Sequence, residues 1–483
     1  MKNSETLLKV KAHYNTDHTM KFYQIIILLS LICSAQQSQA KIRLPALFSN
    51  NMVLQRDTTV NMWGWGDPGE QVQVFASWNP TDTLTTTATR QAQWKLQLKT
   101  PVGPGPYTIT IKGHNTITLH NVLLGEVWIA SGQSNMEWSA SAGITNKEEA
   151  IANAENANIR FFDVPRTSSQ YPQDDVDAQW VESNPETMPS FSAIAYFFGK
   201  KLNAELDVPI GLIGANWGGT PAEIWMPEES FAANDSLAKA ATLLKKEQWG
   251  PSEPGRAYNG MIAPLTPYTI AGVIWYQGET NTSNAAYYEY TFTHLITSWR
   301  QAWNVDFPFY FAQIAPYNYG DNFSGVEVRD AQRRTLKMPH TGMVVLGDLG
   351  EDDNIHPKNK RAVGLRFANL ALANHYEKNI LAESPLVDHV TQVSANKVEV
   401  YLKNGKDLHR ANKERANAVF ELAGADKQFQ QANNVKIEEG KIIVRSAVQD
   451  PLYIRYGWGN IAIPGIYNAA DLPMSSFSVP VEK

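Results

Sequence analysis

Cysteine is almost absent from this chain: Cys33 is the only one among 483 residues. A single cysteine excludes a disulfide framework, and its place in an apolar segment near the amino terminus argues against a thiol nucleophile in the folded protein. Positive charge is also scarce, since 42 Lys and Arg face 48 Asp and Glu for a net charge of −6. No basic block is present, so the sequence predicts no nucleic-acid partner.

Groups of His, Cys and carboxylates at metal-ligand spacing are missing as well, so neither a metal nor a cofactor is expected. A long apolar run occurs only at 25–35, where Lys21 precedes it and Ser38-Gln39-Ala40 follows it. This pattern is typical of a secretory signal and is too short to span a membrane comfortably. We therefore predict an extension plus signal peptide over 1–40, a mature chain without a transmembrane segment, and a periplasmic or extracellular location.

The remainder is too long for one hydrophobic core, so two or three domains are expected. Short apolar or alternating runs separated by turns predict an antiparallel β-sandwich over 41–124, with strands at 60–65, 71–75, 94–98 and 107–111. A similar texture over 381–483 predicts a β-rich C-terminal lobe packed on the middle domain, with strands at 397–402, 418–422, 441–445 and 452–456.

Between these lobes, over 125–380, apolar runs alternate with helical patterns, which predicts an α/β domain whose parallel sheet is covered on both faces. Strands are expected at 127–130, 208–215, 270–276, 308–314 and 341–346. Long helices are expected at 192–206 and 286–303, and another near residue 358. Shorter helical stretches are predicted at 146–157 and 228–249, and a surface loop at 166–189.

One serine is placed for chemistry by the strand that precedes it. The apolar run at 127–130 ends in Ser131-Gly132, and Ser134 follows directly. Ligands of open α/β sheets bind at the carboxyl ends of strands, which makes Ser134 a candidate nucleophile. It could equally cap the next helix. Met136 stands where an α/β-hydrolase elbow has its second glycine, so that motif is absent.

A serine nucleophile needs a base and a carboxylate that orients the base. His356 follows the last predicted parallel strand and would lie at the same sheet edge as Ser134. Asp353 lies three residues earlier, so one turn of chain can bring its carboxylate to the imidazole. Acyl transfer also requires donors for the developing oxyanion. The glycines at 218 and 219 and the amide side chains at 277 and 281 follow the next two strands and could supply them.

Four blocks in this order resemble the SGNH (GDSL-like) hydrolases, and more narrowly their sialate O-acetylesterase branch of carbohydrate acetylesterases. The blocks are Ser-Gly-Gln-Ser-Asn-Met at 131–136, Gly-Gly-Thr-Pro with Glu-Ile-Trp at 218–225, Gln-Gly-Glu at 277–279 and Asp-Asn-Ile-His-Pro at 353–357. The resemblance implies a three-layer α/β/α fold and a Ser134-His356-Asp353 triad, with Asp352 or Asp348 as other candidates for the acid.

The same resemblance implies an oxyanion hole formed by the amides of Ser134 and Gly219 and the side chain of Gln277. Gly218 and Asn281 are the alternatives for the last two. Substrate contacts are expected from five residues of these blocks, namely Gln133, Asn135, Trp217, Glu279 and Asn281.

The function that follows is a secreted serine esterase acting on an acetylated carbohydrate. O-acetylated sialic acid is the substrate that the resemblance favours, and Arg256 or Arg329 could meet its carboxylate. Acetylated xylan or another plant glycan is the alternative substrate class. A glycan-binding protein that keeps the hydrolase core only as a scaffold is the alternative of another kind. Oligomeric state is not predicted.

Overall fold

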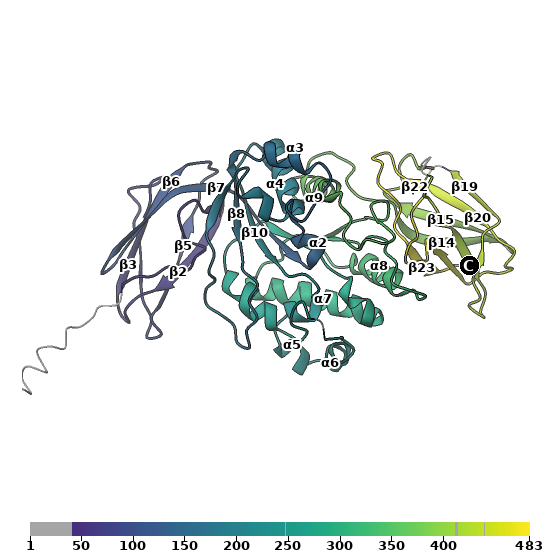
Figure 1. The fold of residues 1–483 in the computed structure, drawn as a ribbon, viewed down its shortest axis with the longest axis horizontal. Coiled ribbons are helices and arrows are strands. Elements are labelled where there is room, and N and C mark those ends of the chain that lie inside the picture. Colours follow the sequence, from purple (N-terminus) through teal and green to yellow (C-terminus); the bar gives the residue numbers. More distant parts are fainter. Residues whose placement is uncertain (1–40, 247, 411–413, 439) are drawn as a thin grey trace, which may run out of the picture.

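The computed structural model describes residues 41–246, 248–410, 414–438 and 440–483 (Figure 1). The predicted signal peptide lies outside these residues. Within them, no helix combines the length and apolar character that a membrane crossing requires.

A mixed sheet with the order β13-β12-β11-β7-β10-β8-β9 forms the centre of the molecule. All neighbouring strands run parallel except β8 and β9, which pair antiparallel. The bounds are β7 Thr116–Gly132, β8 Asn156–Asp163, β9 Trp180–Ser183, β10 Ile210–Asn216, β11 Gly272–Tyr276, β12 Phe309–Ala312 and β13 Thr341–Val344. The five strands predicted from apolar runs are therefore confirmed. Strands β8 and β9 were not predicted, and β9 lies in the segment interpreted as a loop.

Helices cover both faces of this sheet, as the alternating pattern predicted. Figure 1 shows α4 (Ala193–Leu206) and α9 (Lys360–Asn374) on one side, with α7 (Ala285–Trp303) and α8 (Ser324–Thr335) on the other. Ser192 caps α4, because its Oγ accepts the amide of Ala195 at 3.2 Å. The other α-helices of the described residues are short, namely α2 (Ser134–Glu137), α3 (Lys147–Ala152), α5 (Glu229–Ala232) and α6 (Asp235–Thr242).

The N-terminal strands form small sheets that are joined to the central sheet by one long strand. The first part of β7 pairs antiparallel with β6, whereas its last residues pair parallel with β10 and β11. The boundary expected after residue 124 falls inside this strand, so the N-terminal lobe and the central sheet share continuous backbone. The remaining strands are β1 Val53–Gln55, β2 Thr59–Trp65, β3 Gln71–Ala76, β4 Leu84–Thr87, β5 Gln93–Lys99 and β6 Tyr107–Lys112.

The C-terminal residues form a β-rich lobe with its own hydrophobic core. One sheet has the order β14-β15-β20-β19, a second has β18-β17-β21-β23, and β16 pairs with β22. The bounds are β14 Leu386–Ser394, β15 Lys397–Lys403, β16 His409–Arg410, β17 Phe420–Ala423, β18 Gln430–Gln431, β19 Asn434–Glu438, β20 Lys441–Arg445, β21 Tyr453–Tyr456, β22 Ile466–Tyr467 and β23 Phe477–Pro480.

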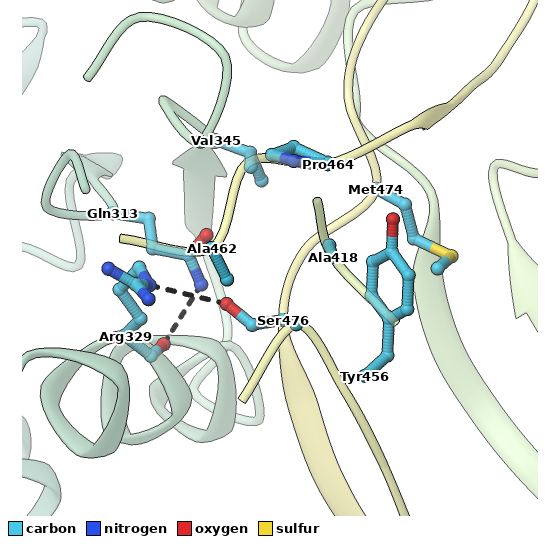
Figure 2. Close-up of a pocket in the computed structure, with 11 residues that line it drawn as sticks. Gln313, Arg329, Val345, Ala418, Tyr456, Ala462, Pro464, Met474 and Ser476 are labelled. Atoms are coloured by element: carbon cyan, nitrogen blue, oxygen red, sulfur yellow. Dashed lines mark hydrogen bonds between the residues drawn. The ribbon is translucent and has the colours of Figure 1, made fainter. Parts of the chain in front are cut away.

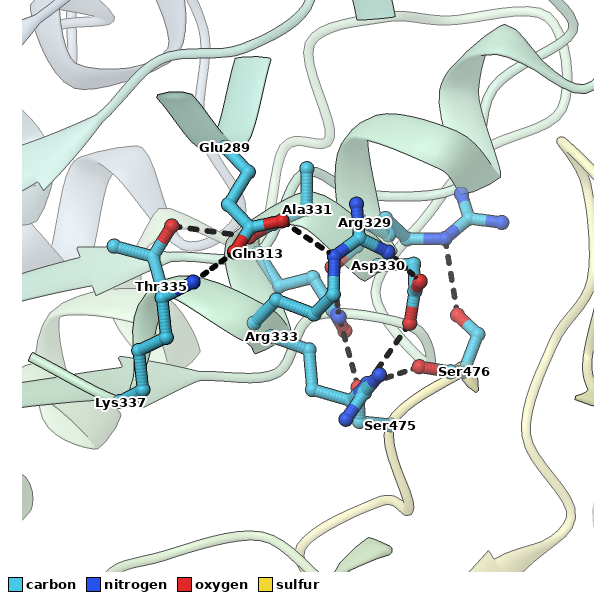
Figure 3. Close-up of polar contacts among 11 residues, drawn as sticks. Glu289, Gln313, Arg329, Asp330, Ala331, Arg333, Thr335, Lys337, Ser475 and Ser476 are labelled. Carbon is cyan, nitrogen blue, oxygen red and sulfur yellow. Dashed lines mark hydrogen bonds and ion pairs between the residues drawn. The ribbon is translucent and has the colours of Figure 1, made fainter. Parts of the chain in front are cut away.

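Buried polar side chains join this lobe to α8. A small pocket at the junction is lined by both parts of the chain, including Gln313 and Arg329 on one side and Tyr456 and Met474 on the other (Figure 2). Gln313 Nε2 donates to Ser475 Oγ at 2.8 Å, and Arg329 Nε donates to Ser476 Oγ at 3.3 Å (Figure 3). The junction is therefore a specific, hydrogen-bonded contact.

Candidate active site

The tight chain turn at the end of β7 leaves Ser134 partly exposed. Gly132 has a φ of +135°, and the amide of Gln133 donates to the carbonyl of Tyr276 at 2.9 Å. A Cβ on Gly132 would lie 2.1 Å from that carbonyl oxygen, so only glycine lets the two strands approach so closely. Ser134 then becomes the first residue of α2, where its own amide has no acceptor within the helix.

His356 reaches Ser134 from a loop 222 residues further along the chain. The distance between His356 Nε2 and Ser134 Oγ is 2.8 Å, which is hydrogen-bond length. Trp138 stacks on the imidazole with ring centroids 4.2 Å apart and an interplanar angle of 21°. Sequence reasoning missed Trp138, although it lies four residues after Ser134 and thus on the same side of a helical turn.

Burial, and secondarily the positive charge of Lys360, lowers the pKa of His356 to about 4. Desolvation disfavours the imidazolium, and a nearby cation disfavours it further. The imidazole is therefore neutral at physiological pH, which is the form that can accept the serine proton.

The predicted carboxylate partner of His356 is not brought to it. Asp353 is exposed, and among the described residues no carboxylate hydrogen-bonds to the imidazole. The two alternatives are engaged elsewhere, because Asp352 pairs with Arg415 at 2.9 Å and Asp348 pairs with Arg366 at 2.8 Å. The structure thus assembles the serine and the histidine of the predicted triad, while Asp353 stays a prediction.

Of the two glycines considered for the oxyanion hole, Gly219 has the available amide. The amide of Gly218 donates to Glu137 Oε2 at 2.9 Å, whereas the amide of Gly219 has no acceptor among the described residues. Gly219 also has a φ of +72°, a conformation that favours glycine. Glu137, which the sequence did not single out, therefore holds the turn that carries Gly219.

The amide side chains predicted for the oxyanion hole serve instead as internal braces. Gln277 is fully buried, and its Nε2 donates to Asn281 Oδ1 at 2.6 Å and to the carbonyl of Thr220 at 3.3 Å. Asn281 Nδ2 donates to Glu223 and Asn284, at 2.8 and 3.0 Å. Both side-chain amides donate their hydrogens to other groups of the protein. Their acceptors include Thr220 and Glu223, so they support the segment that follows Gly219.

Three other predicted substrate contacts are also buried. Gln133 Oε1 accepts the amides of Gly278 and Thr280, at 3.4 and 3.3 Å, and Asn135 is hydrogen-bonded to Glu279 at 2.5 Å. Among the five predicted contacts, only Trp217 is partly exposed.

Two side chains that the sequence did not assign, Trp249 and Arg166, adjoin Gly219 and Glu137. Trp217 Nε1 donates to the carbonyl of Trp249 at 2.8 Å, and the Trp249 side chain is 69% exposed. A Cβ on Gly219 would lie 3.1 Å from that of Trp249, so the exposed indole adjoins the oxyanion turn. Arg166 Nε donates to Glu137 Oε1 at 2.6 Å on the same side.

The two arginines suggested for a sialate carboxylate have different surroundings. Arg329 is buried at the C-terminal junction, where its guanidinium donates to the carbonyls of Gly459 and Asn460, so it does not face a substrate. Arg256 is half-buried, and its Nη1 has no hydrogen-bond partner among the described residues.

A family model described as "Carbohydrate esterase, sialic acid-specific acetylesterase" matches residues 124–373. The chain belongs to this family. Both the serine segment and the histidine loop lie within the matched region. The resemblance inferred from the four sequence blocks is confirmed, and the family supports an acetylesterase acting on carbohydrate.

Relatives and solved structures agree with this assignment over most of the chain. The Pongo abelii sialate O-acetylesterase is 30% identical over 439 residues, covering 82% of this chain and 83% of that protein. The Homo sapiens sialate O-acetylesterase is 29% identical, covering 89% of this chain and 90% of that protein. The crystal structure of a carbohydrate acetylesterase from Xanthomonas citri is 33% identical with a TM-score of 0.83, covering 91% of this chain and 99% of that one.

Outside the site, the described residues include one group of potential metal ligands that spacing did not reveal. Asp67, Glu70 and His114 lie within 4.8 Å of one another in the N-terminal lobe. Glu70 accepts the amides of the other two residues, at 2.9 and 2.5 Å. These bonds tie Glu70 to the segments that carry Asp67 and His114.

Proposed function

We propose that this protein is an exported serine esterase that removes O-acetyl groups from carbohydrate, with O-acetylated sialic acids as preferred substrates. The observation that carries the proposal is the 2.8 Å contact between Ser134 Oγ and His356 Nε2. A hydroxyl bonded to a neutral imidazole is the arrangement that nucleophilic acyl transfer requires.

The reaction follows from these groups. Ser134 Oγ attacks the acetyl carbonyl carbon while His356 takes its proton, and the oxyanion is held by the amides of Ser134 and Gly219. The tetrahedral intermediate collapses when His356 returns the proton to the sugar oxygen, which leaves as a hydroxyl and leaves an acetylated serine. Water, deprotonated by the same histidine, then attacks the acetyl-serine. The bond between the acetyl carbon and Ser134 Oγ breaks, His356 returns the proton to Oγ, and acetate is released.

The surroundings of Ser134 support a sugar substrate. The exposed indole of Trp249 offers a flat apolar face of the kind on which pyranose rings stack. Arg166, which is about half exposed beside Glu137, offers a cation for a sialate carboxylate. Two curated relatives named as sialate O-acetylesterases support the same preference.

Acetate release by the purified protein tests the proposal, with O-acetylated sialic acid and acetylated xylo-oligosaccharide as parallel substrates. We expect the sialic acid to be hydrolysed faster and Ser134→Ala to lose at least about a thousandfold in kcat, as nucleophile removal does in serine hydrolases. Preference for the xylo-oligosaccharide would reassign the substrate class. Turnover equal in wild type and Ser134→Ala would overturn the serine mechanism, and glycan binding without turnover would indicate a binding protein.

Export is tested separately by expressing the full chain in a Gram-negative host. We expect the fractionated product to be periplasmic or secreted and to lack residues 1–40 on amino-terminal sequencing. An intact, cytosolic product would contradict this part of the proposal.

A further inference from the structure

A charged network is buried directly behind the catalytic pair. Lys360 at the start of α9 is 1% exposed, Glu279 after β11 is 5% exposed, and Asn135 on α2 is completely buried. Lys360 Nζ donates to Asn135 Oδ1 at 2.5 Å, and Asn135 Nδ2 donates to Glu279 Oε1 at 2.5 Å. A single amide therefore bridges a buried ammonium and a buried carboxyl group.

The bridging amide also connects the two segments that carry the chemistry. Asn135 follows Ser134 in the chain, and its Nδ2 donates a second bond, of 2.9 Å, to the carbonyl of Ile355. Ile355 immediately precedes His356. The side chain next to the serine thus holds the backbone next to the histidine, and it fixes the separation of the two.

The Trp138 indole lies in contact with both Lys360 and the imidazole of His356. Its Nζ lies 5.8 Å from the centroid of the Trp138 indole, which is the ring that stacks on His356. An ammonium over an indole is attracted by the ring face, and in a desolvated site its charge is poorly screened from the next ring.

We propose that Lys360, Asn135 and Glu279 form a positioning network that sets the distance between Ser134 and His356 and keeps the imidazole neutral. The network adjoins the reacting residues through Asn135, which follows Ser134 in the chain and bonds the backbone that precedes His356. It rests on the proposed esterase function and extends it, because it orients the pair as a triad carboxylate does elsewhere. Its charge acts in the opposite sense, since a triad carboxylate favours the imidazolium and Lys360 disfavours it.

Stability alone is a poor reason for burying these groups. A buried ion pair is often no more stabilising than apolar residues of the same volume, since desolvation offsets the attraction. Buried ionisable groups with shifted pKa values gather at functional sites. Burial lowers the pKa of Lys360 to about 7 and raises the pKa of Glu279 to about 7. Below pH 7 the ammonium is therefore charged while the carboxyl group is neutral, which leaves a net positive charge behind the imidazole.

Several charged groups lie on the elements around His356: Glu137 on α2, Glu279 after β11, Glu351, Asp353 and Lys358 on its own loop, and Lys360 on α9. Among them, Lys360 is the one whose charge lowers the pKa of His356. Removing the charge of Lys360 must therefore raise the pKa of His356. Since the base has to be neutral, the acidic limb of kcat/KM must then move to higher pH.

The test is the pH dependence of kcat/KM for a small aryl acetate in wild type, Lys360→Met and Lys360→Gln. Met matches the length of the aliphatic stem, and Gln keeps a donor for Asn135, so the two variants differ in their risk of misfolding. We expect both to move the acidic limb up by roughly half a pH unit or more. Lys358→Met is the matched control, because it removes an exposed lysine two residues away, and we expect its limb to stay at the wild-type pH.

A purely structural role predicts a different result. If a Lys360 variant melts within a few degrees of wild type and keeps the wild-type acidic limb, the electrostatic part of the proposal is wrong. Asn135→Ala tests the positioning part: we expect kcat to fall at least tenfold with a smaller change in KM, and an unchanged kcat would overturn it. Ser134→Ala separates these results from the parent proposal, because activity in that variant contradicts the esterase mechanism itself.

Discussion

His356, the proposed base, has surroundings that control its protonation. It is half-buried, stacked on Trp138 and adjacent to the buried Lys360, and each of these features disfavours the imidazolium. Because its pKa is lowered and the neutral form is the reactive one, protonation removes activity only at pH values well below the ordinary value of 6.5.

The pH profile of the wild-type enzyme follows directly. We expect kcat/KM to be nearly constant from neutral pH down to about pH 5 and to fall as the pH approaches the His356 pKa of about 4. Initial rates with an aryl acetate in buffers of constant ionic strength measure the profile. A midpoint near 6.5 would show that the imidazole is not shielded as the structure indicates.

Asp353 decides whether the protein uses a third catalytic residue. Its carboxylate is exposed and has no bond to the imidazole, so we expect Asp353→Asn to lower kcat by less than about tenfold. Asp352→Asn is the matched control on the neighbouring residue. A loss on the order of ten-thousandfold, as for a true triad aspartate, would mean that Asp353 turns onto the imidazole in the substrate complex.

At the scale of elements, the approach of β7 to β11 positions Ser134, the proposed nucleophile. The two strands pair from Gly272 and Trp128 to Tyr276 and Gly132, and the chain then turns sharply into α2. The turn depends on a glycine in a left-handed conformation whose missing Cβ leaves room for the carbonyl of Tyr276.

A comparison of Gly132→Ala with Gly143→Ala separates two effects: the collision of a new Cβ with the neighbouring strand, and the strain of a positive φ. Gly143 has a φ of +102° and open space where a Cβ would stand, so we expect a loss of about 1 kcal/mol in the free energy of unfolding. Gly132→Ala adds a collision with backbone, and we expect a loss above about 3 kcal/mol together with loss of activity. Urea unfolding measures both. Equal losses of unfolding free energy in the two variants would show that the close approach of Gly132 to the carbonyl of Tyr276 is not essential.

At the scale of the whole molecule, the C-terminal lobe is held to the catalytic part by buried hydrogen bonds. Arg329 on α8 donates to two backbone carbonyls and to Ser476 of the lobe, and burial lowers its pKa to about 10. Among the described residues it has no carboxylate partner, so its charge is stabilised by dipoles of the lobe.

Arg329→Met therefore tests the coupling of the two parts. We expect the free energy of unfolding to fall by roughly 2 to 4 kcal/mol, because the acceptors are left buried without donors. We also expect calorimetry to resolve a separate transition of the lobe. Lys337→Met, just beyond the same helix but mostly exposed, is the control. A single transition at the wild-type temperature would show that the lobe is held by other contacts.

Local sequence determined the elements in which pattern and structure agree. The apolar runs gave the five parallel strands, and the residues after them placed Ser134 and His356 at one sheet edge. Strand β8 was not predicted because Arg160 interrupts its apolar run. In the structure that arginine is buried and bonded to Glu182 of β9 at 2.6 Å, a partner 22 residues away that periodicity cannot reveal.

Only the tertiary structure decided the roles of the polar side chains around the serine. Gln277 and Asn281 have the right chemistry for oxyanion donors, but Gln277 donates to Asn281 and to the carbonyl of Thr220, and Asn281 donates to Glu223. Asp353 has the right spacing but faces solvent, whereas Lys360, unremarkable in sequence, is buried behind the catalytic pair. The periodicity of apolar residues is a local property and can be read from the sequence. The partner of a hydrogen bond and the burial of a charge depend on which distant segments meet, and that is fixed only when the chain folds.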